Sequence, residues 1–195
     1  MQTRETWEHP SFWPYITRCL LRGFHLPASS FLRTLSNHPH GPISKLASLL
    51  STHLSLFPRS HNTTAFPLDH QFLSAHKMWL ARFRAELAIT LGGRKRGRWL
   101  EDNQWAGWES DFRTVVDLME GKAERVLEEA ADWREAVGAW GVLVDLGMRR
   151  DDLPGVVKRI VDKIPVDSTI LDDAIQSDLC SGAIIKVGTW LGACS

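Results

Sequence analysis

The residue types that could do chemistry in this sequence are histidine, cysteine, the carboxylates and one cluster of cations. A zinc site needs several histidines, cysteines or carboxylates at short, defined spacings. The eight histidines form no HExxH motif, and no two of them stand four residues apart. His38 and His40 share the stretch NHPHGP, but no cysteine or carboxylate lies beside them in the sequence. We therefore expect histidines in solvated loops and no metal site.

Nucleophilic and acid–base catalysis also lack a supporting pattern. The sequence contains no GxSxG elbow. Cys19 falls on an apolar helical face, which favours a core position over a reactive thiol. Adjacent carboxylates, such as Glu128 with Glu129 and Asp172 with Asp173, point about 100° apart on a helix and cannot converge on one substrate. We expect them on solvated faces, and we predict no enzyme activity, no catalytic residue and no cofactor.

The stretch GGRKRGRW contains the cluster of cations, which are Arg94, Lys95, Arg96 and Arg98, followed by Trp99. Cations neutralise phosphates and aromatic rings stack on bases, so this cluster could contact nucleic acid. It could also contact a protein partner, act as a short nuclear import signal, or be a solvated connector. It lacks the phosphate-binding GxxxxGK[ST] pattern. No basic helix or known nucleic-acid motif accompanies it, which favours the connector.

The formal net charge of the chain is zero, but the charges are distributed unevenly. Residues 1–100 carry 13 Lys and Arg against 4 Asp and Glu, a net charge of +9. Residues 101–195 carry 10 against 19, a net charge of −9. Such asymmetry is typical of nucleic-acid contact or of attraction between partners, and it also arises where one half of a protein faces the other. The sequence leaves these interpretations open.

Apolar residues recur at spacings of three and four positions along nearly the whole chain, and no alternating strand or hairpin signal is found. Proline and glycine mark the breaks: Gly23 ends the first helix and Pro42 opens the third. Asp132 and either Asp151 or Asp152 are predicted helix caps. The predicted helices cover residues 12–22, 27–36, 42–54, 68–91, 103–119, 120–131, 132–144, 152–164 and 167–179.

These elements predict an all-α fold of about eight to ten antiparallel helices, each about 10–24 residues long. No repeat of fixed period is present, so residues 1–195 are expected to form one segment of an irregular α-solenoid, a stack of antiparallel helices. The nine tryptophans supply large apolar areas for contacts between helices. The predicted core aromatic residues are Phe12, Trp13, Trp79, Phe83, Trp108, Phe112, Trp133 and Trp140.

The helix predicted from Asp132 onwards is interpreted as a packing element rather than the lining of a catalytic site. Trp133 and Trp140 are seven residues apart, so they lie on one face of this helix. Gly138 and Gly141 each cost about 1 kcal/mol relative to alanine in a helix. A helix that keeps such glycines is expected to have a close neighbour on that side.

Cysteine usage and hydropathy limit the cellular setting. The three cysteines are widely spaced, and neither a CxxC motif nor a signal peptide is found, which indicates a reducing compartment. A membrane helix needs about 20 apolar residues. The longest apolar run, near Leu143, is interrupted by Asp145 and Arg149.

Four stretches of the chain resemble the nucleoporin eighty-five family. They are, in order, HPSFWPYITRCLLRGFHLPASSFLRTLSNHP, KMWLARFRAEL, FRTVVDLMEGKAERVLEEAADWREAVGAWGVLVDLGMRRDDLP and LDDAIQSDLCSGAIIKV. They are similar to a helix pair with an LLRG turn, to a Trp-containing helix after a variable loop, to a short helix followed by a Trp-containing helix, and to the start of the following helix pair. The resemblance extends from about residue 7 to residue 187, and residues 188–195 diverge.

The resemblance implies a helical stack of the ancestral coatomer element type with a structural, non-catalytic role. Members of the family belong to the Y-shaped outer-ring complex of the nuclear pore and support protein transport and mRNA export. The implied location is the nucleus, in nuclear pore complexes at the nuclear envelope. The implied partners are a neighbouring coatomer-element nucleoporin and a Seh-type WD-repeat propeller.

The sequence departs from the family in two respects. Family members are several times longer, which predicts that this chain is a fragment or a truncated form. The strand segment that completes the Seh-type propeller is not found in this sequence, which weakens the prediction of that partner. The main alternative function is a helical nucleic-acid-binding or general adaptor domain that uses the basic N-terminal half.

Overall fold

The computed structural model describes residues 5–60, 62–92, 99, 106–167 and 171–180 of the 195-residue chain. Within these ranges all regular secondary structure is helical, which confirms the predicted all-α fold. The described α-helices are α1 Phe12–Leu21, α2 His25–Thr34, α3 Gly41–Ser55, α4 Asp69–Thr90, α5 Ala106–Met119, α6 Ala123–Glu129, α7 Trp133–Ala139, α8 Leu153–Val161 and α9 Leu171–Cys180. Short 3₁₀ turns cover Thr6–Glu8, Leu35–Asn37 and Arg150–Asp152, and a π turn covers Trp140–Val144.

The break between α1 and α2 follows from local sequence signals. Gly23 has a φ of 73°, a left-handed conformation that glycine adopts without steric cost. The N–H of Phe24 donates to the carbonyl of Cys19 at 2.7 Å, and the N–H of Gly23 donates to the carbonyl of Leu20 at 3.0 Å. This pair of bonds is the Schellman arrangement that satisfies the last carbonyls of a helix. Pro42 lies in the first turn of α3, as predicted.

The prediction of an α-helix over residues 132–144 is correct only for its first half, which is α7. Asp132 caps α7 as predicted, because its Oδ1 accepts the N–H of Glu135 at 2.8 Å. From Trp140–Val144 the chain winds as a π turn, in which the N–H of Asp145 donates to the carbonyl of Trp140 at 2.9 Å. Such wider turns are rare and depend on the packing around them, so side-chain spacing does not predict them.

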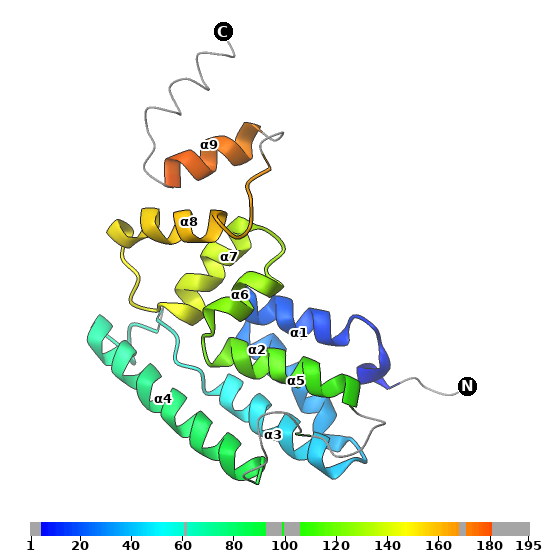
Figure 1. Ribbon diagram of the computed structural model, residues 1–195. Helices are drawn as coiled ribbons and strands as arrows, with labels where there is room; N and C mark the ends of the chain where they lie inside the picture. Colours follow the sequence, from blue (N-terminus) through cyan, green and yellow to red (C-terminus); the bar gives the residue numbers. More distant parts are fainter. Residues whose placement is uncertain (1–4, 61, 93–98, 100–105, 168–170, 181–195) are drawn as a thin grey trace.

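The helices form an irregular stack (Figure 1). Helix α2 packs against both α1 and α3, and α4 packs against α3 at one edge of the molecule. Helix α1 also contacts α5 and α7, so it connects the two halves of the sequence. Helix α8 packs on α7, and α9 packs on α8 at the end of the stack opposite α4. Helices α6, α7 and α8 have 7, 7 and 9 residues and are shorter than predicted.

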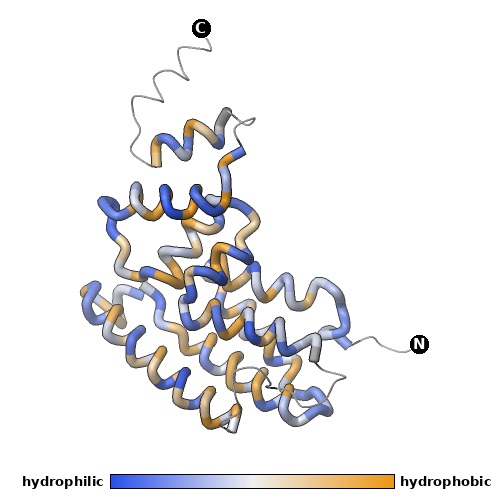
Figure 2. The backbone as a smooth tube through the Cα atoms, in the orientation of Figure 1, coloured by the Kyte–Doolittle hydropathy of each residue, from blue (hydrophilic) through white to orange (hydrophobic). Residues whose placement is uncertain are grey.

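The apolar side chains form two cores, and the hydrophobic positions that supply them recur as orange segments along the helices in Figure 2. The large core lies mainly among α1–α5. Its largest fully buried side chains include Ile16, Leu20, Leu32, Leu50, Phe83 and Phe112. The small core joins α7, the π turn and α8, and its buried residues are Trp133, Ala136, Trp140, Val157 and Ile160. The π turn lies between them, since its Leu143 belongs to the large core and its Trp140 to the small one.

Three histidines are buried, so the expectation of solvated loop histidines is wrong for them. His25 stacks on Phe57, with ring centroids 3.9 Å apart. His53 is buried beside Phe83, with ring centroids 5.2 Å apart, and His38 is buried against aromatic rings. An imidazole has an apolar ring body, which allows it to cover aromatic surface while its nitrogens reach polar groups. Loop composition alone does not reveal this packing.

Two further expectations from the C-terminal half are wrong. Asp173 is buried rather than solvated, because it pairs with Arg134 where α9 meets the rest of the stack. The close neighbour expected at Gly138 is not found among the described residues, since a β-carbon placed there would meet none of their atoms within 4 Å. Gly141 does have a close neighbour, but this is the flexible side chain of Met148 at 3.2 Å rather than a helix backbone.

Candidate interaction surface

The structure places the eight predicted core aromatic residues in three environments. Four are buried in the large core: Phe12, Trp79, Phe83 and Phe112. Trp133 and Trp140 are buried in the small core. Trp13 and Trp108 are half-buried at the surface of the large core. The two half-buried rings meet edge to face with centroids 5.9 Å apart, a geometry that aromatic pairs prefer.

The tryptophans of the small core are packing residues whose rings are covered by arginines. The guanidinium of Arg134 lies 5.4 Å from the ring centroid of Trp133. The guanidinium of Arg159 lies 5.7 Å from that of Trp140. A cation over an aromatic face adds about 0.5–1 kcal/mol at exposed sites. These rings therefore contribute to stability and do not line an open site.

The predicted basic contact residues lie outside the described residues: Arg94, Lys95, Arg96 and Arg98. Trp99, which follows them in sequence, is described and buried. The guanidinium of Arg113 lies over its ring at 5.5 Å from the centroid. Trp99 thus belongs to the folded part of the chain, where it closes one end of a cleft.

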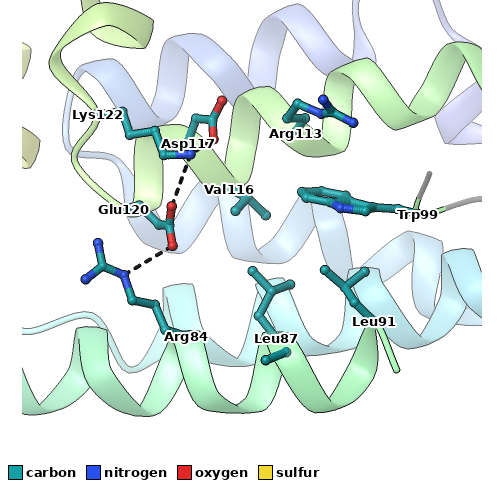
Figure 3. A pocket seen from close by; sticks show the side chains of 10 residues that line it. Arg84, Leu87, Leu91, Trp99, Arg113, Val116, Asp117, Glu120 and Lys122 are labelled. Carbon is teal, nitrogen blue, oxygen red and sulfur yellow. Dashed lines mark hydrogen bonds and ion pairs between the residues drawn. The ribbon is translucent and has the colours of Figure 1, made fainter. Parts of the chain in front are cut away.

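This cleft has a volume of about 570 Å³ and separates α4 from α5 (Figure 3). Its apolar lining is Leu87, Ala88, Leu91, Trp99 and Val116. Figure 3 shows Leu87 of α4 pointing toward Val116 of α5, and Leu91, directly after α4, pointing toward Trp99. An ion pair between Arg84 and Glu120 bridges the two helices at the end opposite Trp99. The cleft is therefore apolar along its middle and bounded at both ends.

The rim of the cleft carries paired charges of unequal exposure. Arg84 Nε donates to Glu120 Oε1 at 3.2 Å, and Lys122 Nζ lies 3.2 Å from Glu120 Oε2 and also pairs with Asp117. The side chains of Glu120 and Asp117 are only 9% and 12% exposed. Those of Arg84, Lys122 and Arg113 are 54%, 38% and 36% exposed. The carboxylates are thus shielded, and the rim presents mainly cations to the solvent.

Sequence reasoning did not single out this cleft. The signal that could have found it is the surplus of apolar positions on the helix predicted over residues 68–91. Trp79 and Phe83 are buried in the large core, but Leu91 remains only half-buried on the side that faces α5. A helix with apolar residues on more than one side has more than one neighbour to meet.

The charge asymmetry is explained in part by contacts within the molecule. Arg18 and Arg22 of α1 both pair with Glu135 of α7, the second at 2.9 Å. Arg84 of α4 pairs with Glu120, as described above. Each of these pairs joins a cation of the basic half to a carboxylate of the acidic half. They support the interpretation that one half faces the other.

Other chemical features of the described residues are limited. Cys19 is buried in the large core, in agreement with its predicted core position. Within the described ranges no group of three or more His, Cys, Asp or Glu side chains is placed to hold a metal ion. None of the helices in the described part of the chain combines the length and apolar character that a membrane crossing requires.

Comparison with protein families relates the chain to the nuclear pore. The profile of the Nup85 nucleoporin family matches residues 1–189, which is nearly the whole chain and includes every helix described above. No curated protein matches the chain with significant similarity. The family match agrees with the resemblance that the sequence motifs indicate.

Proposed function

The chain belongs to the Nup85 nucleoporin family, and we propose that it is a structural subunit of the outer-ring scaffold of the nuclear pore. The observation that carries this proposal is the family match over residues 1–189 together with the all-helical stack. Scaffold subunits act by presenting surfaces at fixed positions, and stacked helices are well suited to this because each helix is held by its neighbours.

The chemistry of the described residues supports a role in contacts rather than in catalysis. The perturbed and buried charges serve packing: Glu135 and Asp173 each pair with arginines that connect helices. A concave feature suited to such contacts is the cleft between α4 and α5. A cleft with an apolar floor and a charged rim is a common form of a protein contact site.

The proposal includes a location and partners. The chain would reside in nuclear pore complexes at the nuclear envelope and support protein transport and mRNA export. Its partners would be a neighbouring coatomer-element nucleoporin and, with less support, a Seh-type propeller. The nucleic-acid alternative has less support, because Arg18 and Arg22 of the basic half share the carboxylate of Glu135 in the same chain.

Localisation and proximity labelling test this proposal. The chain, fused to a fluorescent protein and a biotin ligase, is expressed in cells of its own source. We expect a rim of fluorescence at the nuclear envelope and labelling of outer-ring nucleoporins. A Phe83→Ala variant, whose large core should be less stable by about 3–5 kcal/mol, serves as a control and should weaken both signals. Diffuse fluorescence of the folded parent chain, or labelling of RNA-binding proteins instead of nucleoporins, would contradict the proposal.

A further inference from the structure

The cleft between α4 and α5 has the properties of a docking site that the described helices leave open. Its volume of about 570 Å³ falls within the range of about 300–1,000 Å³ that is typical of binding pockets. Leu87, Leu91 and Val116 provide an aliphatic floor, and Ala88 at the edge is small and exposed. Trp79, Phe83 and Leu87 lie along one buried side of α4, and the cleft opens beside that side at Leu87, Ala88 and Leu91. An apolar side chain from outside could therefore enter without displacing a described helix.

The rim determines the charge of the occupant. Arg84 donates from its Nε atom to Glu120. Arg113 donates from one terminal nitrogen to Glu109 of α5. A guanidinium carries five N–H donors in a planar fork, so both arginines keep donors for a further acceptor. Lys122 adds a third exposed cation at the same rim. Carboxylates of a partner could accept these donors while the partner's apolar side chain fills the floor.

We propose that this cleft binds an acidic amphipathic segment of another protein, with one or two large apolar side chains inserted over Leu87 and Val116. The carboxylates that flank these anchors in the partner would contact Arg84, Arg113 and Lys122. The occupant is a peptide because the floor is aliphatic and the cations of the rim are more exposed than their carboxylate partners Asp117 and Glu120.

The lining of the cleft decides against a nucleic acid. A phosphodiester backbone brings charges in a continuous row, and a single strand binds by stacking its bases on exposed aromatic faces. Trp99 is the aromatic residue of the described lining, and it is buried with Arg113 over its ring. The cleft therefore fits one aliphatic or aromatic side chain and provides a few hydrogen-bond donors at its rim. It does not provide a continuous row of cations for a phosphate backbone.

This inference names the kind of partner that the scaffold role would require, but its test does not depend on the nuclear pore. Binding is measured with the purified chain, whereas the proposed function is tested by localisation in cells. A chain that reaches the nuclear rim without binding acidic peptides would overturn the inference alone. A chain that binds them but stays diffuse in cells would overturn the proposed function alone.

The experiment uses a phage-displayed library of random dodecapeptides, selected on the purified full chain. The enriched peptides are synthesised with a fluorescent label, and their affinities are measured by fluorescence anisotropy at two salt concentrations. Two variants of α4 form a matched pair. Ala88→Trp fills the cleft, and Ala85→Trp places the same side chain three residues away at an exposed position outside the cleft lining. Circular dichroism confirms that both variants fold.

We expect the enriched peptides to combine acidic residues with a large apolar residue. Ala88→Trp should weaken their binding at least about tenfold, and Ala85→Trp should change it less than about twofold. Arg84→Gln should weaken binding and reduce its dependence on salt. The inference is overturned if no peptide is enriched, if the enriched peptides are basic, or if both tryptophan variants bind equally well. It is also overturned if a single-stranded RNA oligonucleotide, used as a competitor, binds tightly and loses its affinity in Ala88→Trp.

Discussion

The region α1–α5 and the region α7–α9 bury their helices in different ways. The first has helices of 10 to 22 residues around the large core. The second has helices of 7 to 10 residues, and its core is limited to the five buried residues of the small cluster. Buried apolar area supplies most of the favourable free energy of folding. We therefore expect α7–α9 to open locally at a lower free energy than α1–α5, although both belong to one stack.

The two regions meet at the π turn Trp140–Val144. Leu143 packs in the large core and Trp140 in the small one, while Val144 contacts both. Gly121, between α5 and α6, lies directly against the backbone of Leu143. The wider turn changes the direction of the helix so that these residues reach different cores. The comparison of the two regions can thus be tested by substitutions in each core and at this junction.

The largest expected effect follows from opening the large core. Phe83 is fully buried, stacks on Trp79 with ring centroids 5.7 Å apart, and contacts His53. Phe83→Ala should lower the free energy of unfolding by about 3–5 kcal/mol, the usual cost of deleting a buried aromatic side chain. Urea denaturation followed by circular dichroism measures this. Met78→Ala in the same helix is the control, since Met78 is 71% exposed and should cost less than about 0.5 kcal/mol.

Trp140→Ala should also cost about 3–5 kcal/mol, but the loss should be confined to the second region. Trp140 fills much of the small core together with Trp133, Val157 and Ile160. Hydrogen exchange measured by mass spectrometry should show faster exchange in α8 and α9, with protection retained in α3. Equal loss of protection in α3 would show that the two cores unfold as one unit, and the distinction between the regions would then fail.

A smaller effect is expected from the contact between α5 and the π turn. Gly121 has a φ of 71°, and a β-carbon there would overlap the carbonyl oxygen of Leu143. Gly121→Ala should therefore cost about 2–4 kcal/mol, from the left-handed conformation and from the overlap. Gly138→Ala is the matched control, because nothing lies within 4 Å of its added carbon and the helix gains up to about 1 kcal/mol. Thermal melts of both variants measure the difference, and equal melting temperatures would contradict the expected contact.

A fall in pH should lower the stability of the region α1–α5, because all eight histidines precede α5 in sequence. Burial, together with the nearby charges of Arg59 and His76, lowers the pKa of His25 to about 4, against a hydrogen bond with the Gly23 backbone that raises it. Burial also lowers the pKa of His76. The unfolded chain takes up a proton near pH 6.5 and the folded chain does not until about pH 4. Stability present above pH 6.5 is therefore lost as the pH falls toward 4.

For His25 alone this difference amounts to about 2 kcal/mol between pH 8 and pH 5. His25→Phe keeps a flat ring that can stack on Phe57 and removes the titrating group. The free energy of unfolding of this variant should therefore change by about 2 kcal/mol less than that of the parent between pH 8 and pH 5. Urea denaturation at both pH values measures the two dependences. His70→Phe, at an exposed position of α4, is the control and should retain the dependence of the parent. An unchanged dependence in His25→Phe would show that other groups cause the acid sensitivity.

The helical fold could be predicted because its signals are local. Pro42 and Gly23 place helix ends by their own backbone preferences, and Asp132 caps α7 three residues before its partner. The apolar spacing of each segment also identifies the side that is buried. Such signals act within one or two turns, and they do not depend on how distant segments pack.

The cleft and the π turn depend on distant segments, so the sequence did not reveal them. Arg84 and Glu120 are 36 positions apart, and their pairing depends on how α3 and α1 hold α4 and α5. The π turn fits against Gly121, which precedes it by about twenty positions. The buried Asp173 requires Arg134 from another helix. In each case the partner residue is brought into contact by the packing of distant helices, which the spacing of residues along the sequence does not indicate.

Glu135 provides the charge contact between the two regions, and it is the site of the smallest expected effect. Its carboxylate accepts the N–H of Ala131 at 2.8 Å and pairs with Arg22 at 2.9 Å and with Arg18. Burial alone would raise the pKa of Glu135, but these donors together lower it. The two arginine side chains are 39% and 59% exposed, so solvent screens much of the attraction.

Glu135→Gln keeps the size of the side chain and should cost about 1 kcal/mol, because two cations lose their partner but remain hydrated. A double-mutant cycle with Arg18→Gln should give a coupling energy of about 0.5–1 kcal/mol. Arg82→Gln, which removes an exposed pair with Glu86 inside α4, is the control and should cost less than about 0.5 kcal/mol. A coupling energy near zero would mean that the pair of Arg18 with Glu135 does not help to hold α7 to α1. The charge contact between the two regions would then rest on Arg22 alone, and Arg18→Gln would leave hydrogen exchange in α7 unchanged.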